Sequence, residues 1–224
     1  MKLNKVECEL KNIYDDWSLG NKTENDPQYS SMFRMGFPDE FLNNDKPLLM
    51  YVGQECLHCN KEKTQVWIRE YQNVQRTKKR ITTDWFDNGT NRSPFWNFYR
   101  RMSNLGFNVL WNNLDKFHPI DNQRLSWEDG VRLNSPYGND NLSVLQREIE
   151  LLKPKVVVFV IGNGKYTASL ASAFSVSEEE LKKYEPNSQE FVAEISNVLG
   201  LKNIVALWTY HPAHLQWAKN IERQ

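Results

Sequence analysis

The chain has 224 residues, of which 40% are hydrophobic and 12% aromatic, which is enough apolar material for one sizeable folded domain. Lysine plus arginine and aspartate plus glutamate each number 28, so the formal net charge is zero. That balance weighs against a general polyanion binder, although it allows a local basic face. No stretch approaches the roughly 18 apolar residues of a membrane span, so no membrane partner is expected.

The cysteine usage predicts a reducing, cytoplasmic environment. The three cysteines are Cys8, Cys56 and Cys59, and the odd count, together with a charged beginning that lacks a secretory pattern, argues against a disulfide scaffold. Cys56-x-x-Cys59 resembles half of a zinc site, which His211 and His214 would have to complete in space. We expect no metal and no cofactor, and that zinc site is the alternative.

Four apolar runs, each ending at a glycine or a polar residue, predict strands at 47–52, 107–111, 155–161 and 203–209. Continuous apolar runs of this length are typical of strands buried on both faces of a parallel sheet. Segments with helical composition lie around them, at 5–17, 60–76, 93–102, 141–152, 165–174 and 188–199, and a last helix runs to residue 221. Alternation of this kind predicts an α/β domain with helices on both faces of the sheet.

The remaining segments complete a single predicted domain over residues 1–224. Residues 1–47 form an N-terminal helical leader, and residues 118–140 form a long irregular insertion of the kind that is commonly functional. Ser93 is the expected N-cap of one helix, and Asp140 or Asn141 the expected N-cap of another.

Polar side chains follow the predicted strands where each one ends. They are Gln54 and Glu55 after Gly53, Asn113 after the second strand, and His211 after the fourth. Since the carboxyl ends of parallel strands meet at one edge of a sheet, we expect these groups to lie together. A carboxylate, an amide and a histidine at one edge indicate a reaction centre rather than packing.

Several of these residues resemble motifs of the uracil-DNA glycosylase superfamily. Residues 53–58, Gly-Gln-Glu-Cys-Leu-His, are similar to its first motif, GQDPYH, and residues 211–215, His-Pro-Ala-His-Leu, to its second, HPSPL. Phe95 resembles the aromatic residue that stacks on the extruded base, and Asn113 the asparagine that reads it. Residues 151–158 resemble the segment leading to the third strand, and the resemblance spans about residues 47–220 in the right order.

The resemblance implies a three-layer α/β/α sandwich with a four-stranded parallel sheet, and a monomeric enzyme that acts on DNA. It implies a glycosylase that hydrolyses the N-glycosidic bond of a flipped pyrimidine and leaves an abasic site. Glu55 would orient the attacking water, and His211 would hydrogen-bond the leaving base. The implied base-binding residues are Gln54, Leu57, Phe95 and Asn113, and the implied DNA contacts are His214, Leu215, Arg100, Arg101, Lys78 and Lys79.

The first motif departs from the family pattern at three positions. Glu55 replaces an aspartate, Cys56 a proline, and Leu57 a tyrosine whose ring blocks the C5 edge of the pyrimidine in the strict uracil enzymes. Because leucine is smaller, we expect the pocket to admit either uracil or a C5-modified pyrimidine of the kind found in phage DNA, which would suit a role in phage defence. The iron–sulfur branch of the superfamily needs four cysteines, and this chain has three.

Two alternatives stay open. The altered first motif and the zero net charge fit an inactive superfamily member that binds DNA or another protein. The Gly-Asn-Gly sequence at 162–164 would fit nucleotide binding on a generic α/β sheet, but it lacks the lysine and hydroxyl of a P-loop.

Overall fold

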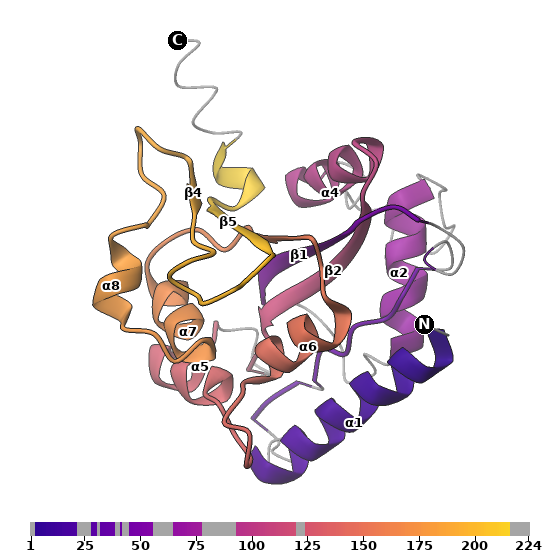
Figure 1. Cartoon of the computed structure of the whole chain (residues 1–224), viewed down its shortest axis with the longest axis horizontal. Coiled ribbons are helices and arrows are strands. Elements are labelled where there is room, and N and C mark those ends of the chain that lie inside the picture. Colours follow the sequence, from indigo (N-terminus) through magenta and orange to yellow (C-terminus); the bar gives the residue numbers. More distant parts are fainter. Residues whose placement is uncertain are drawn as a thin grey trace.

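A computed structural model describes residues 3–21, 28–30, 32–38, 41, 45–55, 65–77, 93–119 and 124–215. They form an α/β fold around one five-stranded sheet (Figure 1). The strands are β1 (Leu48–Glu55), β2 (Asn108–Asp115), β3 (Val156–Phe159), β4 (Val192–Glu194) and β5 (Val205–Thr209). The helices are α1 (Leu3–Asn21), α2 (Gln65–Thr77), α4 (Pro94–Asn104), α5 (Trp127–Asn134), α6 (Val144–Leu152), α7 (Lys165–Ala173) and α8 (Glu178–Lys182).

The strand order is β2-β1-β3-β5-β4, and every pairing is parallel except that of β4 with β5. The chain passes from β1 outward to β2 on one side, and from β3 outward to β5 on the other. The order therefore reverses between β1 and β3, and the crevice outside the carboxyl ends of such strands is where open α/β sheets bind ligands.

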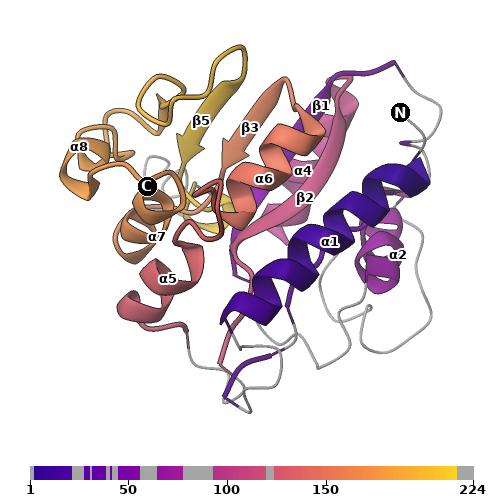
Figure 2. The ribbon, with the colours of Figure 1, turned by 60° about the horizontal axis from the view of Figure 1, so that its bottom comes forward.

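Helices cover both faces of the sheet. Figure 2 shows α1 and α6 on the near side of the strands and α4 on the far side. Side chains alternate accordingly along β2: Trp111 packs edge-on against Trp96 of α4, with ring centroids 4.9 Å apart, whereas Asn112 bonds to Glu148 of α6 on the other face. The same alternation places Asn113 on the α4 side.

The α/β class predicted from the sequence is confirmed, but the four-stranded sheet is wrong, because β4 adds a fifth strand at one edge. The helix predicted over 188–199 is replaced by β4 and a turn. Val192 pairs with Thr209, and Ile195 N–H donates to Ala206 O at 2.9 Å. Pairing with the otherwise open edge of β5 prevails over a local composition that favours helix.

Two further predictions about local structure are corrected. The predicted irregular segment 118–140 contains α5, whose N-cap Ser126 accepts a hydrogen bond from Asp129 N–H at 3.0 Å. Helix α6 is capped by Ser143, in a reciprocal capping box with Gln146, and not by Asp140 or Asn141. The second strand also extends beyond its predicted end, through Asn113 to residue 115.

Across the part of the chain that the structure describes, no helix is both long and apolar enough to span a membrane.

Candidate functional site at the carboxyl edge of the sheet

The carboxyl ends of β1 and β3 are joined by a side chain. Gln54 Nε2 donates to Ile161 O at 2.7 Å. The next residue, Gly162, has a φ of 72°, which favours glycine, and a Cβ there would lie 3.8 Å from Gln54 Nε2 and 4.0 Å from His211 N. Gln54 and the backbone of His211 therefore both lie next to Gly162, where the ends of β1, β3 and β5 converge as predicted.

The side chains of Phe95 and Asn113 both pack against Gly53 of β1, at the same edge of the sheet. A Cβ on Gly53 would lie 2.8 Å from Asn113 Oδ1 and 3.0 Å from Phe95 Cε2, so only a glycine lets these side chains approach β1 so closely. The Phe95 ring stacks on the His211 imidazole, with centroids 5.8 Å apart and an interplanar angle of 16°. The structure thus brings together four of the predicted site residues: Gln54, Phe95, Asn113 and His211.

The Asn113 side chain is buried, with 2% of its surface exposed, and is held at one end only. Its Oδ1 accepts a hydrogen bond from Trp111 Nε1 at 3.0 Å, while Nδ2 is buried without a hydrogen-bond partner among the described residues. A buried donor that is left unpaired costs about 1–3 kcal/mol. A ligand that offered an acceptor to Nδ2 would recover that energy.

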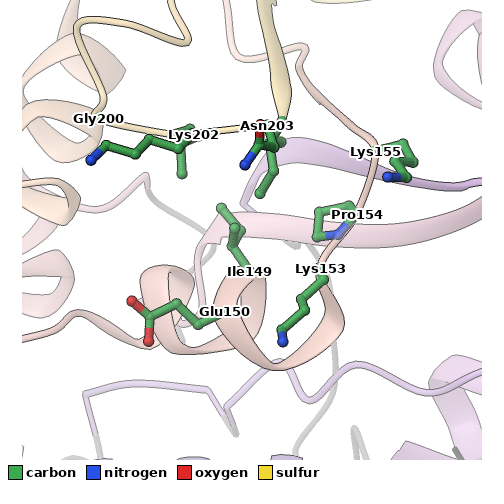
Figure 3. Close-up of a pocket in the computed structure, with 10 residues that line it drawn as sticks. Ile149, Glu150, Lys153, Pro154, Lys155, Gly200, Lys202 and Asn203 are labelled. Carbon is green, nitrogen blue, oxygen red and sulfur yellow. The ribbon is translucent and has the colours of Figure 1, made fainter.

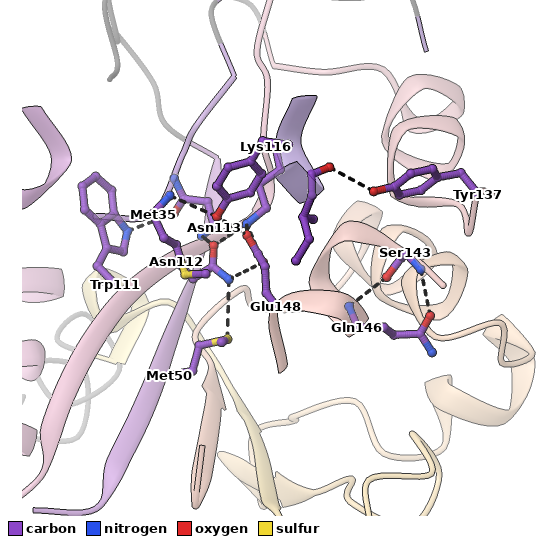
Figure 4. A network of polar contacts seen from close by, with 12 residues as sticks. Met35, Met50, Trp111, Asn112, Asn113, Lys116, Tyr137, Ser143, Gln146 and Glu148 are labelled. Atoms are coloured by element: carbon purple, nitrogen blue, oxygen red, sulfur yellow. Dashed lines mark hydrogen bonds and ion pairs between the residues drawn. The ribbon is translucent and has the colours of Figure 1, made fainter. Parts of the chain in front are cut away.

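The backbone of Asn113 is fixed by a buried polar network on the α6 side of the sheet (Figure 4). Asn113 N–H donates to Asn112 Oδ1 at 2.8 Å, and Asn112 Nδ2 donates to Glu148 Oε2 at 2.8 Å. Lys116 Nζ bonds to both Glu148 oxygens, at 2.7 and 2.8 Å, and also to Asn112 Oδ1. Tyr14 of α1 donates to Glu148 Oε1 at 2.7 Å.

Burial alters the titration of this network. The pKa of Lys116 is lowered by burial, although the Glu148 carboxylate opposes that shift, and the pKa of Tyr14 is raised by burial and by the same carboxylate. The network joins α1 and α6 to β2 at the residue that precedes Asn113.

His211 is arranged to act as a neutral hydrogen-bond donor. Its Nδ1 accepts a hydrogen bond from Ala213 N–H at 3.2 Å, so the proton of the neutral ring is carried by Nε2. Burial and the positive charge of Arg124 lower the pKa of His211 below its usual 6.5.

The Glu55 carboxylate lies in a closed environment, with only 1% of the side chain exposed. Its Oε1 accepts hydrogen bonds from Tyr166 OH at 2.7 Å and Lys165 Nζ at 3.3 Å, and its Oε2 accepts one from Leu125 N–H at 3.4 Å. Burial and the Glu55 charge raise the pKa of Tyr166 well above its usual range. None of the hydrogen bonds described for Glu55 joins it to Phe95, Asn113 or His211.

A second carboxyl group lies beside Glu55, because Asp115 is its register partner on β2. Asp115 is buried and accepts a hydrogen bond from Asn134 Nδ2 at 2.7 Å. Burial, with a contribution from the Glu55 charge and against the effect of the Asn134 bond, raises the pKa of Asp115 to about 7.

The predicted DNA contacts fall into three groups. His214 is exposed and stacks on Tyr210 at 4.4 Å, Leu215 is half-buried in the helical turn 212–215, and Arg101 is exposed on α4. Arg100 is instead buried and donates to Gln75 O at 3.0 Å, so it holds α4 against α2 and is not placed to contact DNA. Lys78 and Lys79 lie outside the described residues, and so does Leu57, which was predicted to bind the base.

Four residues at this edge were missed by the sequence reasoning: Asp115, Arg124, Lys165 and Tyr166. Lys165 and Tyr166 begin the helix that follows the third strand, and Asp115 ends the second strand. Their positions next to strand ends were the only sequence signal that these three residues lie at this edge. Arg124 lies within the predicted insertion, which was expected to be functional as a segment but in which no pattern singled out this residue.

Among the described residues no group of three or more His, Cys, Asp or Glu side chains could hold a metal ion, while Cys56 and Cys59 lie outside them. A hollow lined by Lys153, Lys155 and Lys202 lies at the amino ends of β3 and β5, which is the opposite edge of the sheet (Figure 3).

Comparison with models of known protein families gives no match, and a search of curated proteins gives none either.

Proposed function

We propose that this protein is a DNA glycosylase, a divergent member of the uracil-DNA glycosylase superfamily that removes a flipped pyrimidine. The observation that carries the proposal is the meeting of Phe95, Asn113 and His211 at the point where the strand order reverses. An aromatic ring, an unpaired amide donor and a neutral imidazole are what a site needs to stack, read and release a base.

The base would lie against Phe95 and bond to Asn113. Base–aromatic stacking is worth about 1–3 kcal/mol per base. The Nδ2 of Asn113, which has no hydrogen-bond partner among the described residues, would donate to the bound base. Gln54, anchored through Ile161 O, would close the pocket beside His211.

His211 would stabilise the leaving base. As the bond between the sugar C1′ and the base nitrogen breaks, its electron pair passes to the base, and a neutral Nε2–H donates a hydrogen bond to the oxygen on which the charge develops. The lowered pKa of His211 supports the neutral ring, and the acceptor role of its Nδ1 supports the tautomer that carries the proton on Nε2.

Glu55 would orient the water that attacks C1′ and accept its proton. In the free protein its carboxylate is closed off by Tyr166, Lys165 and Leu125, so DNA binding must open that cover. Lys165 is the natural part to move, because 26% of its side chain is exposed and its bond to Glu55 is long, at 3.3 Å.

The DNA backbone would lie along the rim of this edge. His214 is exposed in the turn that follows β5, and Leu215 beside it would fill the gap that the flipped base leaves. Arg101 is exposed in the last turn of α4, toward the start of β2 at the other edge of the sheet, so any phosphate contact it makes would lie away from this site. Lys78 and Lys79 remain expected phosphate contacts on the basis of the sequence.

A base-release experiment tests the proposal. Duplex and single-stranded DNA carrying uracil, thymine, hydroxymethylcytosine or glucosylated hydroxymethylcytosine is incubated with the protein, and free bases are measured by mass spectrometry. We expect release of at least one C5-substituted base, and we expect Leu57→Tyr to lose that activity while it keeps any activity on uracil. Release of uracil alone would contradict the C5 hypothesis.

An inactive binding module is the second candidate, and the closed environment of Glu55 favours it. It predicts that the protein binds one of these DNAs without releasing any base. The same mass-spectrometric assay, run beside a DNA-binding titration, separates the two functions.

A further inference from the structure

Trp111 is buried in an aromatic cluster beside the proposed base-reading residue. It lies two residues before Asn113 on β2, on the same face of the sheet, and 6% of it is exposed. Its ring contacts those of Phe33 at 4.8 Å, Trp96 at 4.9 Å and Tyr71 at 5.7 Å. The indole is therefore fixed by packing on several sides.

The indole N–H determines which way the Asn113 amide points. The two ends of an amide have nearly the same shape and differ only in that one accepts and the other donates hydrogen bonds. If Asn113 flipped, its NH₂ group would face the Trp111 N–H where Oδ1 now accepts at 3.0 Å, and two donors would meet. In a buried site the loss of that bond disfavours the flipped form roughly ten-fold or more.

The main chain of Asn113 cannot compensate by shifting. Its N–H is bonded to Asn112 Oδ1, which also accepts from Lys116, and Asn112 Nδ2 is bonded to Glu148. Both the backbone and the acceptor end of Asn113 are therefore held, and Nδ2 is the end that is buried without a hydrogen-bond partner among the described residues.

Pyrimidines divide into two classes by the edge that such an amide reads. A 4-oxo pyrimidine presents an acceptor oxygen beside an N3–H donor, whereas a 4-amino pyrimidine presents an amino donor beside an N3 acceptor. The two edges need opposite orders of donor and acceptor from the amide. An amide that flips freely can read both, and a fixed amide reads one.

We propose that Trp111 is a specificity-determining residue, which fixes the Asn113 amide so that the pocket accepts either 4-oxo or 4-amino pyrimidines but not both. The proposal rests on the proposed function in that Asn113 is taken to face the base. Trp111 itself does not touch the base and acts through Asn113 as a positioning residue.

The test compares Trp111→Phe with Trp96→Phe. The first variant keeps a ring in the cluster and removes the donor to Asn113, and the second makes the same truncation at the neighbouring ring. Dissociation constants of the free bases 5-hydroxymethyluracil and 5-hydroxymethylcytosine are measured by ligand-observed NMR titration. We expect the wild type and Trp96→Phe to prefer one base about ten-fold or more, and Trp111→Phe to bind the two within about three-fold.

Three results would overturn the proposal: a wild type that binds both bases equally, a ratio that Trp111→Phe leaves unchanged, or no binding of either base. If Trp111→Phe does not fold, hydrogen exchange on the wild type decides. The indole N–H of Trp111 must stay protected when the preferred base is bound, and exchange at the rate of an unbonded indole would contradict the proposal.

Parallel base-release assays keep this inference separate from the proposed function. Selective binding of one class without any release would refute the glycosylase and leave Trp111 as the selectivity residue of a binding module. Release of both classes at similar rates by the wild type would support the glycosylase and refute the role of Trp111.

Discussion

Burial changes the pKa of Asp115. It is buried beside Glu55, and its pKa is raised from the usual 3.8 to about 7. A carboxyl group with a raised pKa in the folded state binds its proton more tightly there than in the unfolded chain. Its contribution to stability is therefore greatest in acid and is lost as the pH rises from about 4 through 7.

Asp115→Asn should remove this pH dependence, because the asparagine keeps an acceptor for Asn134 and cannot ionise. Between pH 5 and pH 8 the wild type should lose on the order of 2 kcal/mol of unfolding free energy that the variant does not lose. Urea unfolding at the two pH values measures the difference, with Asp45→Asn as the exposed control. Equal pH dependence in the wild type and Asp115→Asn would contradict the prediction.

His211 leads to a second pH prediction. Since its pKa lies below the usual 6.5, the imidazole is mainly neutral at physiological pH, and its Nε2–H would donate to the leaving base in the proposed reaction. The base release of the proposed glycosylase, measured under single-turnover conditions, should therefore fall to half of its plateau rate only below pH 6.5. A rate already half lost at pH 6.5 would show that this imidazole titrates normally.

At the scale of elements, the Lys116–Glu148 ion pair joins β2 to α6, with both side chains almost completely buried. Lys116→Met should leave the Glu148 carboxylate charged and buried without its cation, and should destabilise the protein by about 3–5 kcal/mol in urea unfolding. The matched control is Lys182→Met, which removes an exposed pair with Glu178 and should have a negligible effect. Similar losses in the two variants would contradict the structural role of the buried pair.

Gly36 shows how closely the leader approaches α2. A Cβ there would lie 2.1 Å from Gln65 O and 2.8 Å from Arg69 N, both of them backbone atoms of that helix. Gly36→Ala should therefore displace α2 or the leader and lower the melting temperature by several degrees. Gly106→Ala is an informative comparison, since a Cβ there meets nothing within 4 Å and only its φ of 95° is strained. A larger loss at Gly106 would show that backbone conformation outweighs this close approach.

The sequence predicted elements well where local patterns determine them. The apolar runs gave β1, β3 and β5, and Ser93 with Pro94 marked the start of α4. The sequence failed where contacts between distant segments decide the structure. The partners of β4 and of Glu55 come from other parts of the chain, and no local spacing reveals them.

At the scale of the whole molecule, the parallel topology explains why part of the site could be predicted. Strand ends in a parallel sheet meet at one edge, so Gln54, Asn113 and His211 could be expected to lie close together, and they do. The direction of a side chain at that edge could not be predicted, because it depends on which helix covers it. Glu55 is the example: it points to Tyr166 and Lys165 of α7.

In the proposed reaction Glu55 orients the water that attacks C1′ and accepts its proton. The Glu55→Gln variant tests this role most directly. The variant and the wild type are compared in single-turnover base release and in DNA binding on the best substrate of the panel. We predict that Glu55→Gln binds DNA within about three-fold of the wild type and releases the base at least ~100-fold more slowly. Undiminished release by Glu55→Gln, or no base release by the wild type on any substrate, would contradict the claim.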